Sequence, residues 1–189
     1  EMTVKLTKEE MLRRRRIADG LEPLRTDCTI ARTDGIDIDA YLATELRRRY
    51  LHLLDHAPRE LLATENLSGD TDSRKVALDE TEGAQIDVPG RARRVFGIRM
   101  RGWQRAAEVL PAERLDEVVA RQRNPYTAAT AWRPVAVFTS GDSTGCTGPI
   151  LAWPLTGLYP EVEELVAVCD PGEEFYILDE AGVEELIKN

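Results

Sequence analysis

A chain of 189 residues with 42% hydrophobic and 31% charged residues is long enough to bury a core and too apolar to be disordered throughout. No apolar run approaches the ~20 residues that span a bilayer, and no stretch near the start has the short apolar core of a secretion signal. Three cysteines, Cys28, Cys146 and Cys169, lie far apart and are odd in number. They predict neither a disulfide framework nor a metal site, and this usage fits a reducing cytoplasm.

The net charge of −9 is unevenly distributed along the chain. Residues 1–60 are balanced and residues 61–90 carry −5, whereas residues 91–134 carry +6 and residues 135–189 carry −10. Such segregation favours an oriented partner or a second copy of the chain, with a positive side meeting a negative side. The alternative is that the two blocks neutralise each other within one fold.

The first predicted helix begins after Thr7, which is a candidate N-cap with Glu10 as its capping-box partner. This helix is expected to run to Asp19–Gly20. Four consecutive arginines, Arg13–Arg16, cannot all lie on one face at 100° per residue. They indicate a solvated helix or, as the alternative, an arm that binds nucleic acid.

A second helix is predicted over Ile38–Asp55, with Asp34 or Asp37 as its cap and an end near Ala57 before Pro58. The apolar stripe that predicts it consists of Ile38, Leu42, Leu46, Tyr50, Leu53 and Leu54. The two helices, joined by a turn-rich stretch over Pro23–Gly35, are expected to pack as a hairpin.

Residues 64–83 are polar and acidic, and we expect a surface loop or linker there. After it the apolar period changes from 3.6 to 2, which predicts strands over Ala84–Val88 and Val95–Met100. Further strands are predicted at Pro134–Thr139, Pro149–Trp153, Leu165–Cys169 and Glu174–Leu178. A helix after Pro111 has Leu115, Val118 and Val119 on one face, and a last helix capped by Asp179 has Val183, Leu186 and Ile187 as its buried face.

The predicted fold class is therefore α+β, with an N-terminal helical hairpin followed by a mostly antiparallel sheet, one inserted helix and a C-terminal helix. Residues 1–63 would be the helical front, 64–83 the acidic loop and 84–189 the β-rich part of one integrated domain.

His52 and His56 are the only histidines, and their spacing of four places both rings on one helix face with Asp55 between them. The pattern H-L-L-D-H is close to the H-x-x-E-H of some zinc peptidases, but it has Asp in place of the catalytic Glu. A third ligand would have to be a carboxylate or a cysteine. A histidine near a helix C-terminus is also favoured by the helix dipole alone.

The stretch Gly141–Gly148 (GDSTGCTG) lies between two predicted strands. It lacks the G-K-[ST] ending of a phosphate-binding loop, and no histidine and aspartate stand in the context that a serine nucleophile needs. A hairpin loop explains it, with Cys146 as an exposed thiol.

An arginine-rich band over residues 91–105 includes Arg94, Arg99 and Arg101 beside Trp103. Arginines next to an aromatic side chain can bind phosphates or acidic protein surfaces. The negative net charge favours a protein partner over nucleic acid, and Arg94, Arg99, Arg101 and Trp103 are our candidate interaction residues.

Residues 24–140 contain an R-V-x-x-I-R-M strand over Arg94–Met100 followed by Trp103, then Q-x-N-P-Y over Gln122–Tyr126 and R-P-V-A over Arg133–Ala136. With these features the chain resembles small uncharacterised proteins of tailed phages and prophages of gut bacteria, of the neck or head–tail adaptor kind. The resemblance implies a repeated structural subunit, and segregated charge suits ring assembly. It also implies a virion component if the gene is of phage origin.

The leading functional hypothesis is a non-enzymatic structural or assembly protein that binds a protein partner or itself, with no cofactor and no membrane. We expect charge reversal at Arg99 and Arg101 to abolish such self-association or partner binding. One alternative is a metal-dependent hydrolase that uses His52 and His56. The other is a nucleic-acid-binding accessory protein that uses the arginine band. No small-molecule substrate is indicated.

Overall fold

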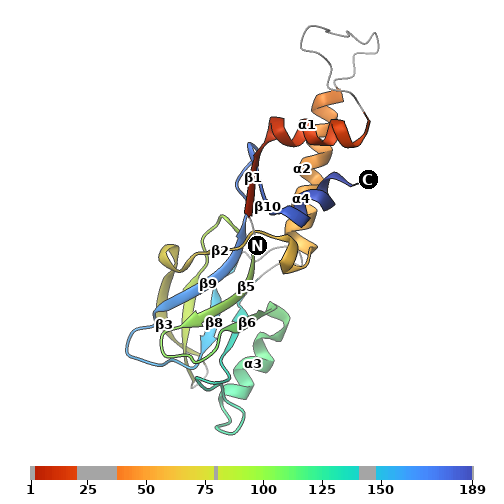
Figure 1. Ribbon diagram of the computed structural model, residues 1–189. Helices are drawn as coiled ribbons and strands as arrows, with labels where there is room; N and C mark the ends of the chain where they lie inside the picture. The colour runs from red at the N-terminus through yellow and green to blue at the C-terminus, as the bar shows by residue number, and fades with distance from the viewer. Residues whose placement is uncertain (1–2, 21–37, 79–80, 141–147, 189) are drawn as a thin grey trace. The chain divides into compact units, whose positions relative to one another are not determined.

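The computed structural model describes residues 3–20, 38–78, 81–140 and 148–188. The protein is α+β (Figure 1), and it divides into two compact units. Unit 1 is Glu1–Ala63 with Asp170–Asn189, and unit 2 is Thr64–Cys169.

Among the described residues, no helix is both long enough and apolar enough to cross a membrane. Several residues singled out in the sequence lie outside the described ranges: Cys28, Asp34, Asp37, Cys146, the Pro23–Gly35 stretch and residues 141–147.

The described residues of unit 1 form a two-stranded ribbon, three α-helices and one short 3-10 helix. Its elements in chain order are β1 (Thr3–Thr7), α1 (Lys8–Ala18), α2 (Ile38–His56), the short 3-10 helix η1 (Arg59–Leu61), β10 (Phe175–Asp179) and α4 (Glu180–Ile187). The predicted capping box is confirmed: the Thr7 hydroxyl accepts from the Glu10 N–H at 3.2 Å, and the Glu10 carboxylate accepts from the Thr7 N–H at 2.9 Å.

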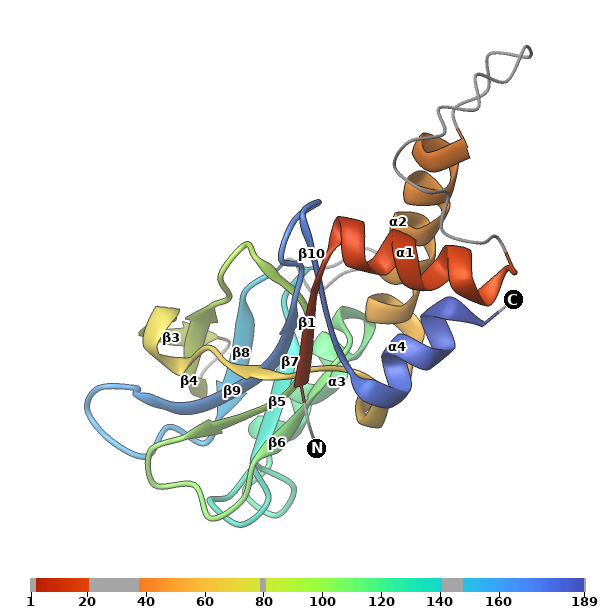
Figure 2. The ribbon, with the colours of Figure 1, turned by 45° about the horizontal axis from the view of Figure 1, so that its top comes forward.

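The predicted N-terminal helical hairpin is wrong. A strand precedes the first helix, and β1 pairs antiparallel with β10 from Thr3↔Asp179 to Thr7↔Phe175. In Figure 2, α1 lies across α2 rather than alongside it. The physical reason is the pairing of β1 with a strand at the far end of the chain: a five-residue strand with one buried side chain, Leu6, has too little alternation to be recognised locally.

Aromatic and aliphatic side chains from both ends of the chain form the core of unit 1. The Tyr50 and Tyr176 rings meet edge to face with centroids 5.0 Å apart. The Tyr50 hydroxyl donates to the Ile177 carbonyl at 3.3 Å and accepts from the Ile177 N–H at 3.2 Å. Other buried core members are Met11, Leu46, Leu54, Leu62, Leu178, Val183 and Leu186. The C-terminal segment is therefore part of this core.

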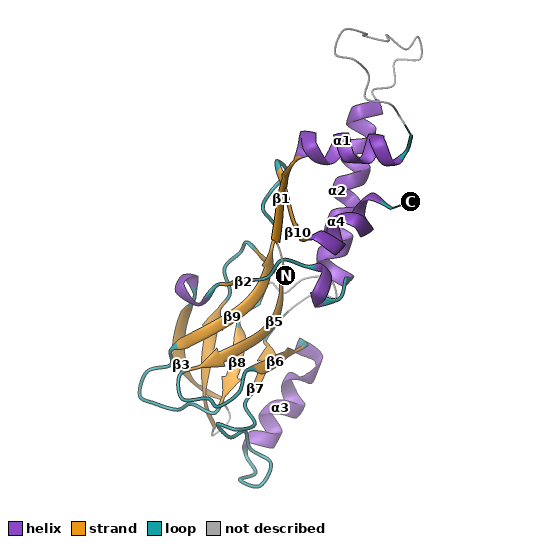
Figure 3. Cartoon of the chain, viewed as in Figure 1, coloured by secondary structure: helices purple, strands orange, loops and turns teal. Residues whose placement is uncertain are grey.

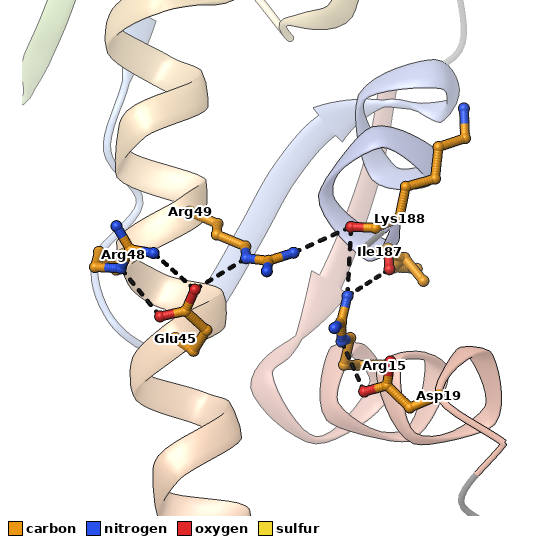
Figure 4. A network of polar contacts seen from close by, with 7 residues as sticks. All are labelled: Arg15, Asp19, Glu45, Arg48, Arg49, Ile187 and Lys188. Carbon is orange, nitrogen blue, oxygen red and sulfur yellow. Dashed lines mark hydrogen bonds and ion pairs between the residues drawn. The ribbon is translucent and has the colours of Figure 1, made fainter.

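Two arginines hold the end of α4 (Figure 4). Arg15 donates to the Ile187 carbonyl at 2.6 Å and pairs with Asp19 at 2.9 Å, while Arg49 donates to the Lys188 carbonyl at 3.0 Å. Helix ends leave their last carbonyls without intrahelical donors, so these guanidinium groups satisfy them. Hydrogen bonds from Arg48 and Arg49 lower the pKa of Glu45 to about 2. Arg15 and Arg49 therefore serve the fold of this unit.

Unit 2 contains a curled sheet (Figure 3). Its described residues form eight strands in the order β2-β9-β5-β6-β7-β8-β4-β3, and among these β6 and β7 alone pair in parallel. Its strands are β2 (Glu65–Asn66), β3 (Asp72–Leu78), β4 (Thr81–Asp87), β5 (Ala92–Met100), β6 (Ala107–Leu110), β7 (Val135–Phe138), β8 (Ile150–Trp153) and β9 (Val162–Cys169). The 3-10 helix η2 (Ser68–Asp70) follows β2, and η3 (Ala112–Arg114) leads into α3 (Leu115–Gln122).

The acidic stretch 64–83 differs from the expected loop. It contains β2, η2, β3 and the start of β4, and β3 pairs with β4 as an antiparallel hairpin. Its polar character has a structural reason: β3 is an edge strand, so most of its side chains face water and only Ser73, Val76 and Leu78 are half-buried. In β5, register shifts interrupt strict alternation, and Val95 rather than Phe96 lies on the buried side.

Apolar side chains pack on both faces of this sheet. One face carries a large apolar cluster that includes Ile86, Ile98, Ile150 and Leu165, and the other is partly covered by α3. On the α3 side, Val118 and Val119 pack with Val137, Leu151 and Trp153. Because α3 is short, it leaves part of this second face open beside the β3–β4 hairpin.

Candidate functional site

The arginine band lies beside acidic side chains of the same chain. Strands β5 and β9 are antiparallel neighbours, so Arg99 comes within 3.8 Å of Glu163 and 3.5 Å of Glu164. Arg101 pairs with Glu161 at 2.6 Å, and this contact raises the pKa of the Arg101 guanidinium. Within unit 2, the positive and negative blocks of the sequence thus meet across one strand pair.

The other two candidate interaction residues also make internal contacts. Arg94 stacks over the Phe96 ring at 4.6 Å from its centroid. Trp103 is only 4% exposed, and its indole N–H donates to the Pro154 carbonyl at 2.9 Å. Trp103 therefore positions neighbouring loops from inside the fold and offers little surface to a partner.

The histidine pair lies on the exposed side of α2. The two rings stack with centroids 4.5 Å apart, and His56 Nδ1 is 3.2 Å from the His52 carbonyl oxygen. Within the described ranges, no group of three His, Cys, Asp or Glu side chains is arranged to hold a metal ion. Two stacked imidazoles without a third ligand do not define a catalytic metal site.

Cys169 is the one described cysteine, and it is half-buried at the end of β9. Desolvation raises the pKa of its thiol to about 11, with Glu65 adding to the shift. A thiol of this kind is protonated at neutral pH and is a poor nucleophile.

Three loops of unit 2 are tied together by hydrogen bonds, and we call them the three-loop surface: residues 101–106, 123–134 and 154–161. The Trp103 indole links the first loop to the third, and the Gln104 N–H donates to the Ala131 carbonyl at 2.8 Å, which links the first to the second. The Arg101 N–H donates to the Glu161 carbonyl at 2.9 Å. These contacts fix the loops relative to one another.

Large apolar side chains project from this surface. Six such side chains are exposed among the described residues, and four of them belong to two of these loops. They are Tyr126 (90% exposed), Trp132 (67%), Leu158 (85%) and Tyr159 (88%). Scattered exposed apolar residues need no explanation, but a concentration on neighbouring loops marks a contact surface.

A groove of about 610 Å³ opens between the same two loops and the β3–β4 hairpin. Its floor includes Trp153, and the sides include Ala129 and Leu158. At the hairpin, Lys75 and Glu82 form an ion pair at 2.6 Å and leave that side without net charge. Packing of Gly83 against Trp153 is so close that an added Cβ would lie 2.7 Å from the indole nitrogen. The groove is thus a depression with a mixed polar and apolar lining, in which Gly83 packs closely beneath Trp153.

Comparison with protein-family models, with curated proteins and with solved structures finds no match. The site therefore stands on geometry alone. Sequence reasoning singled out Trp103 and missed Trp132, Leu158 and Tyr159. The available signal was the position of these large side chains in Gly- and Pro-flanked segments, outside any apolar stripe of period 2 or 3.6.

Proposed function

We propose that this chain is a non-enzymatic interaction protein that binds another protein through the three-loop surface. The observation that carries the proposal is the concentration of exposed Tyr126, Trp132, Leu158 and Tyr159 on loops that flank one groove. Tyr and Trp are enriched at the centres of protein interfaces, where their rings bury large areas at low entropic cost. The internal hydrogen bonds of the loops support the same role, because a fixed surface loses little freedom on binding.

The resemblance of residues 24–140 to phage neck or head–tail adaptor proteins adds support of the same kind, since such proteins act by contact with their neighbours. We include self-association within the proposal. In unit 2 the arginines of β5 already have acidic partners in the same chain. The aromatic loops, rather than these arginines, are the surface that we expect to bind.

Selection of peptides from a displayed random library tests the proposal. The paired variant Leu158→Ser with Tyr159→Ser removes apolar area without touching the core. As the control, Tyr41→Ser removes an aromatic side chain of unit 1 that is 65% exposed. We expect the selection to yield a family of related peptides. These peptides should bind the wild type and the Tyr41 variant with the same affinity. They should bind the paired variant at least about tenfold more weakly, which is a loss of about 1.4 kcal/mol in binding free energy.

Light scattering after size exclusion measures the oligomeric state of the same samples and so tests self-association. An oligomer that the paired variant dissociates, and that Tyr41→Ser leaves intact, supports the proposal. A monomer that selects no peptide family, or peptides that bind all three proteins equally, contradicts it.

A further inference from the structure

Two arginines of the three-loop surface, Arg105 and Arg133, belong to loops that are joined by a backbone hydrogen bond. The 104–131 backbone hydrogen bond places Arg105 beside the segment that carries Trp132 and Arg133. That segment is itself held by a small bridge, in which the Arg133 N–H donates to the Thr130 carbonyl at 2.9 Å and the Thr130 N–H donates to the Arg133 carbonyl at 3.2 Å. The exposed Trp132 is thus next to Arg133 in sequence, on a segment that is hydrogen-bonded to the loop of Arg105.

Both arginines differ from three other exposed arginines of unit 2, each of which has an acidic partner. Arg101 pairs with Glu161, Arg114 pairs with Glu117 at 2.8 Å, and Arg91 pairs with Asp70. The side chains of Arg105 and Arg133 are exposed, and within the part of the chain that the structure describes they have no ion pair, hydrogen bond or ring contact. Their guanidinium groups are therefore available to an external acceptor.

We infer that the three-loop surface recognises a short, extended, acidic segment of a protein, with carboxylates bound by Arg105 and Arg133 and an apolar side chain packed on Trp132. This inference rests on the proposed function and specifies its partner chemistry. A guanidinium group matches a carboxylate with two parallel hydrogen bonds, and it does so most strongly beside an aromatic surface that excludes water.

An acidic protein segment suits this surface better than nucleic acid does. A nucleic-acid backbone presents a continuous row of phosphates and requires a row of available cations. Here Arg99 and Arg101 are already bound by Glu161, Glu163 and Glu164, which would repel phosphates next to the site. Two available guanidinium groups match the charge of a short carboxylate pair.

Fluorescence polarisation with three labelled probes tests the inference on the full chain. The probes are a peptide of about twelve residues in which Glu alternates with Leu, the same peptide with Gln in place of Glu, and an oligothymidylate of similar length. We expect the Glu peptide to bind at least about tenfold more tightly than the Gln peptide at about 50 mM NaCl, with a smaller difference at about 300 mM.

Two variants test whether Arg105 and Arg133 cause the difference in affinity between the Glu and Gln peptides. Arg105→Gln with Arg133→Gln should make the two peptides bind equally, and Arg114→Gln, whose wild-type side chain pairs within the chain, should preserve the difference. Equal binding of both peptides to the wild type, still weakened by Leu158→Ser with Tyr159→Ser, would overturn this inference and leave the proposed function standing.

Two other outcomes also overturn the inference. Tighter binding of the oligothymidylate, lost in the Arg105 and Arg133 variant, would identify a nucleic-acid surface instead. Absence of binding by either peptide would reject an acidic segment as the partner. Circular dichroism of each variant checks that the exposed substitutions leave the fold unchanged.

Discussion

Unit 1 and unit 2 both contain many arginines, but the buried or half-buried arginines of unit 1 and two loop arginines of unit 2 have different surroundings. In unit 1, Arg15 is 8% exposed and donates to the end of α4, and Arg47 forms two hydrogen bonds with Asp170 at 2.6 and 2.8 Å. In unit 2, Arg105 and Arg133 extend from loops into solvent. Arginine content therefore does not by itself identify a binding surface. A guanidinium group is available to a partner only where the surrounding chain supplies no acceptor for its hydrogen bonds.

The first prediction would break unit 1 alone. Gly182 lies in α4 against the Leu61 carbonyl, and an added Cβ would collide with that backbone oxygen. We expect Gly182→Ala to lower the free energy of unfolding by about 3 kcal/mol, because backbone atoms cannot move aside easily. Urea denaturation gives the magnitude, and hydrogen exchange should rise in residues 3–18 and 175–187. The exposed neighbour provides the control, Ala181→Ser, for which no such loss is expected.

The second prediction concerns alkaline pH and the Tyr50 hydroxyl. Burial raises the pKa of Tyr50 to about 12, above its ordinary value of about 10. The folded state therefore favours the protonated phenol, and this preference contributes to the free energy of unfolding. The contribution is constant below about pH 10 and is lost as the pH rises from about 10 to 12. The loss should reach about 2 to 3 kcal/mol. Denaturant titrations across this range should show a steeper fall for the wild type than for Tyr50→Phe, and equal slopes would contradict the assignment.

The third prediction is the unit 2 counterpart of the first. In Gly83→Ala, the new methyl group would lie 2.7 Å from the Trp153 indole nitrogen and 3.2 Å from the Ala152 carbonyl oxygen. We expect a loss of about 2 kcal/mol, since a buried ring can shift slightly more than a backbone carbonyl can. Increased hydrogen exchange should centre on β3, β4 and β8. Gly69→Ala, with no atom within 4 Å of the added Cβ, should be neutral, and equal losses in both variants would reject this explanation.

The smallest expected effect is that of removing exposed side chains from the three-loop surface. Trp132→Ser and Tyr159→Ser remove large side chains that are 67% and 88% exposed, so each should change the free energy of unfolding by less than about 0.5 kcal/mol. In contrast, Trp103→Ser removes a buried ring that orders the loops and should cost several times more. Thermal denaturation of the three variants gives the result. A large loss for Trp132→Ser would show that this side chain belongs to the fold rather than to a binding surface.

Local patterns were sufficient for several elements. The Thr7–Glu10 capping box identified the start of α1, and the apolar stripe of α2 identified a helix that ends at His56, two residues before Pro58. Strands β7 and β8 lie within predicted segments, as does α4. These features depend on residues only a few positions apart, so the sequence by itself determined them.

Tertiary structure alone decided the remaining features. The β1–β10 pairing joins the two ends of the chain, and it replaced the expected helical hairpin. Strand pairing between β5 and β9 brought Arg99 beside Glu163 and Glu164. The same long-range packing buried Trp103 and left Trp132 exposed, although both lie in irregular segments. Periodicity reports which side chains share a face, but the burial of one side chain in a loop depends on which distant segments pack against it.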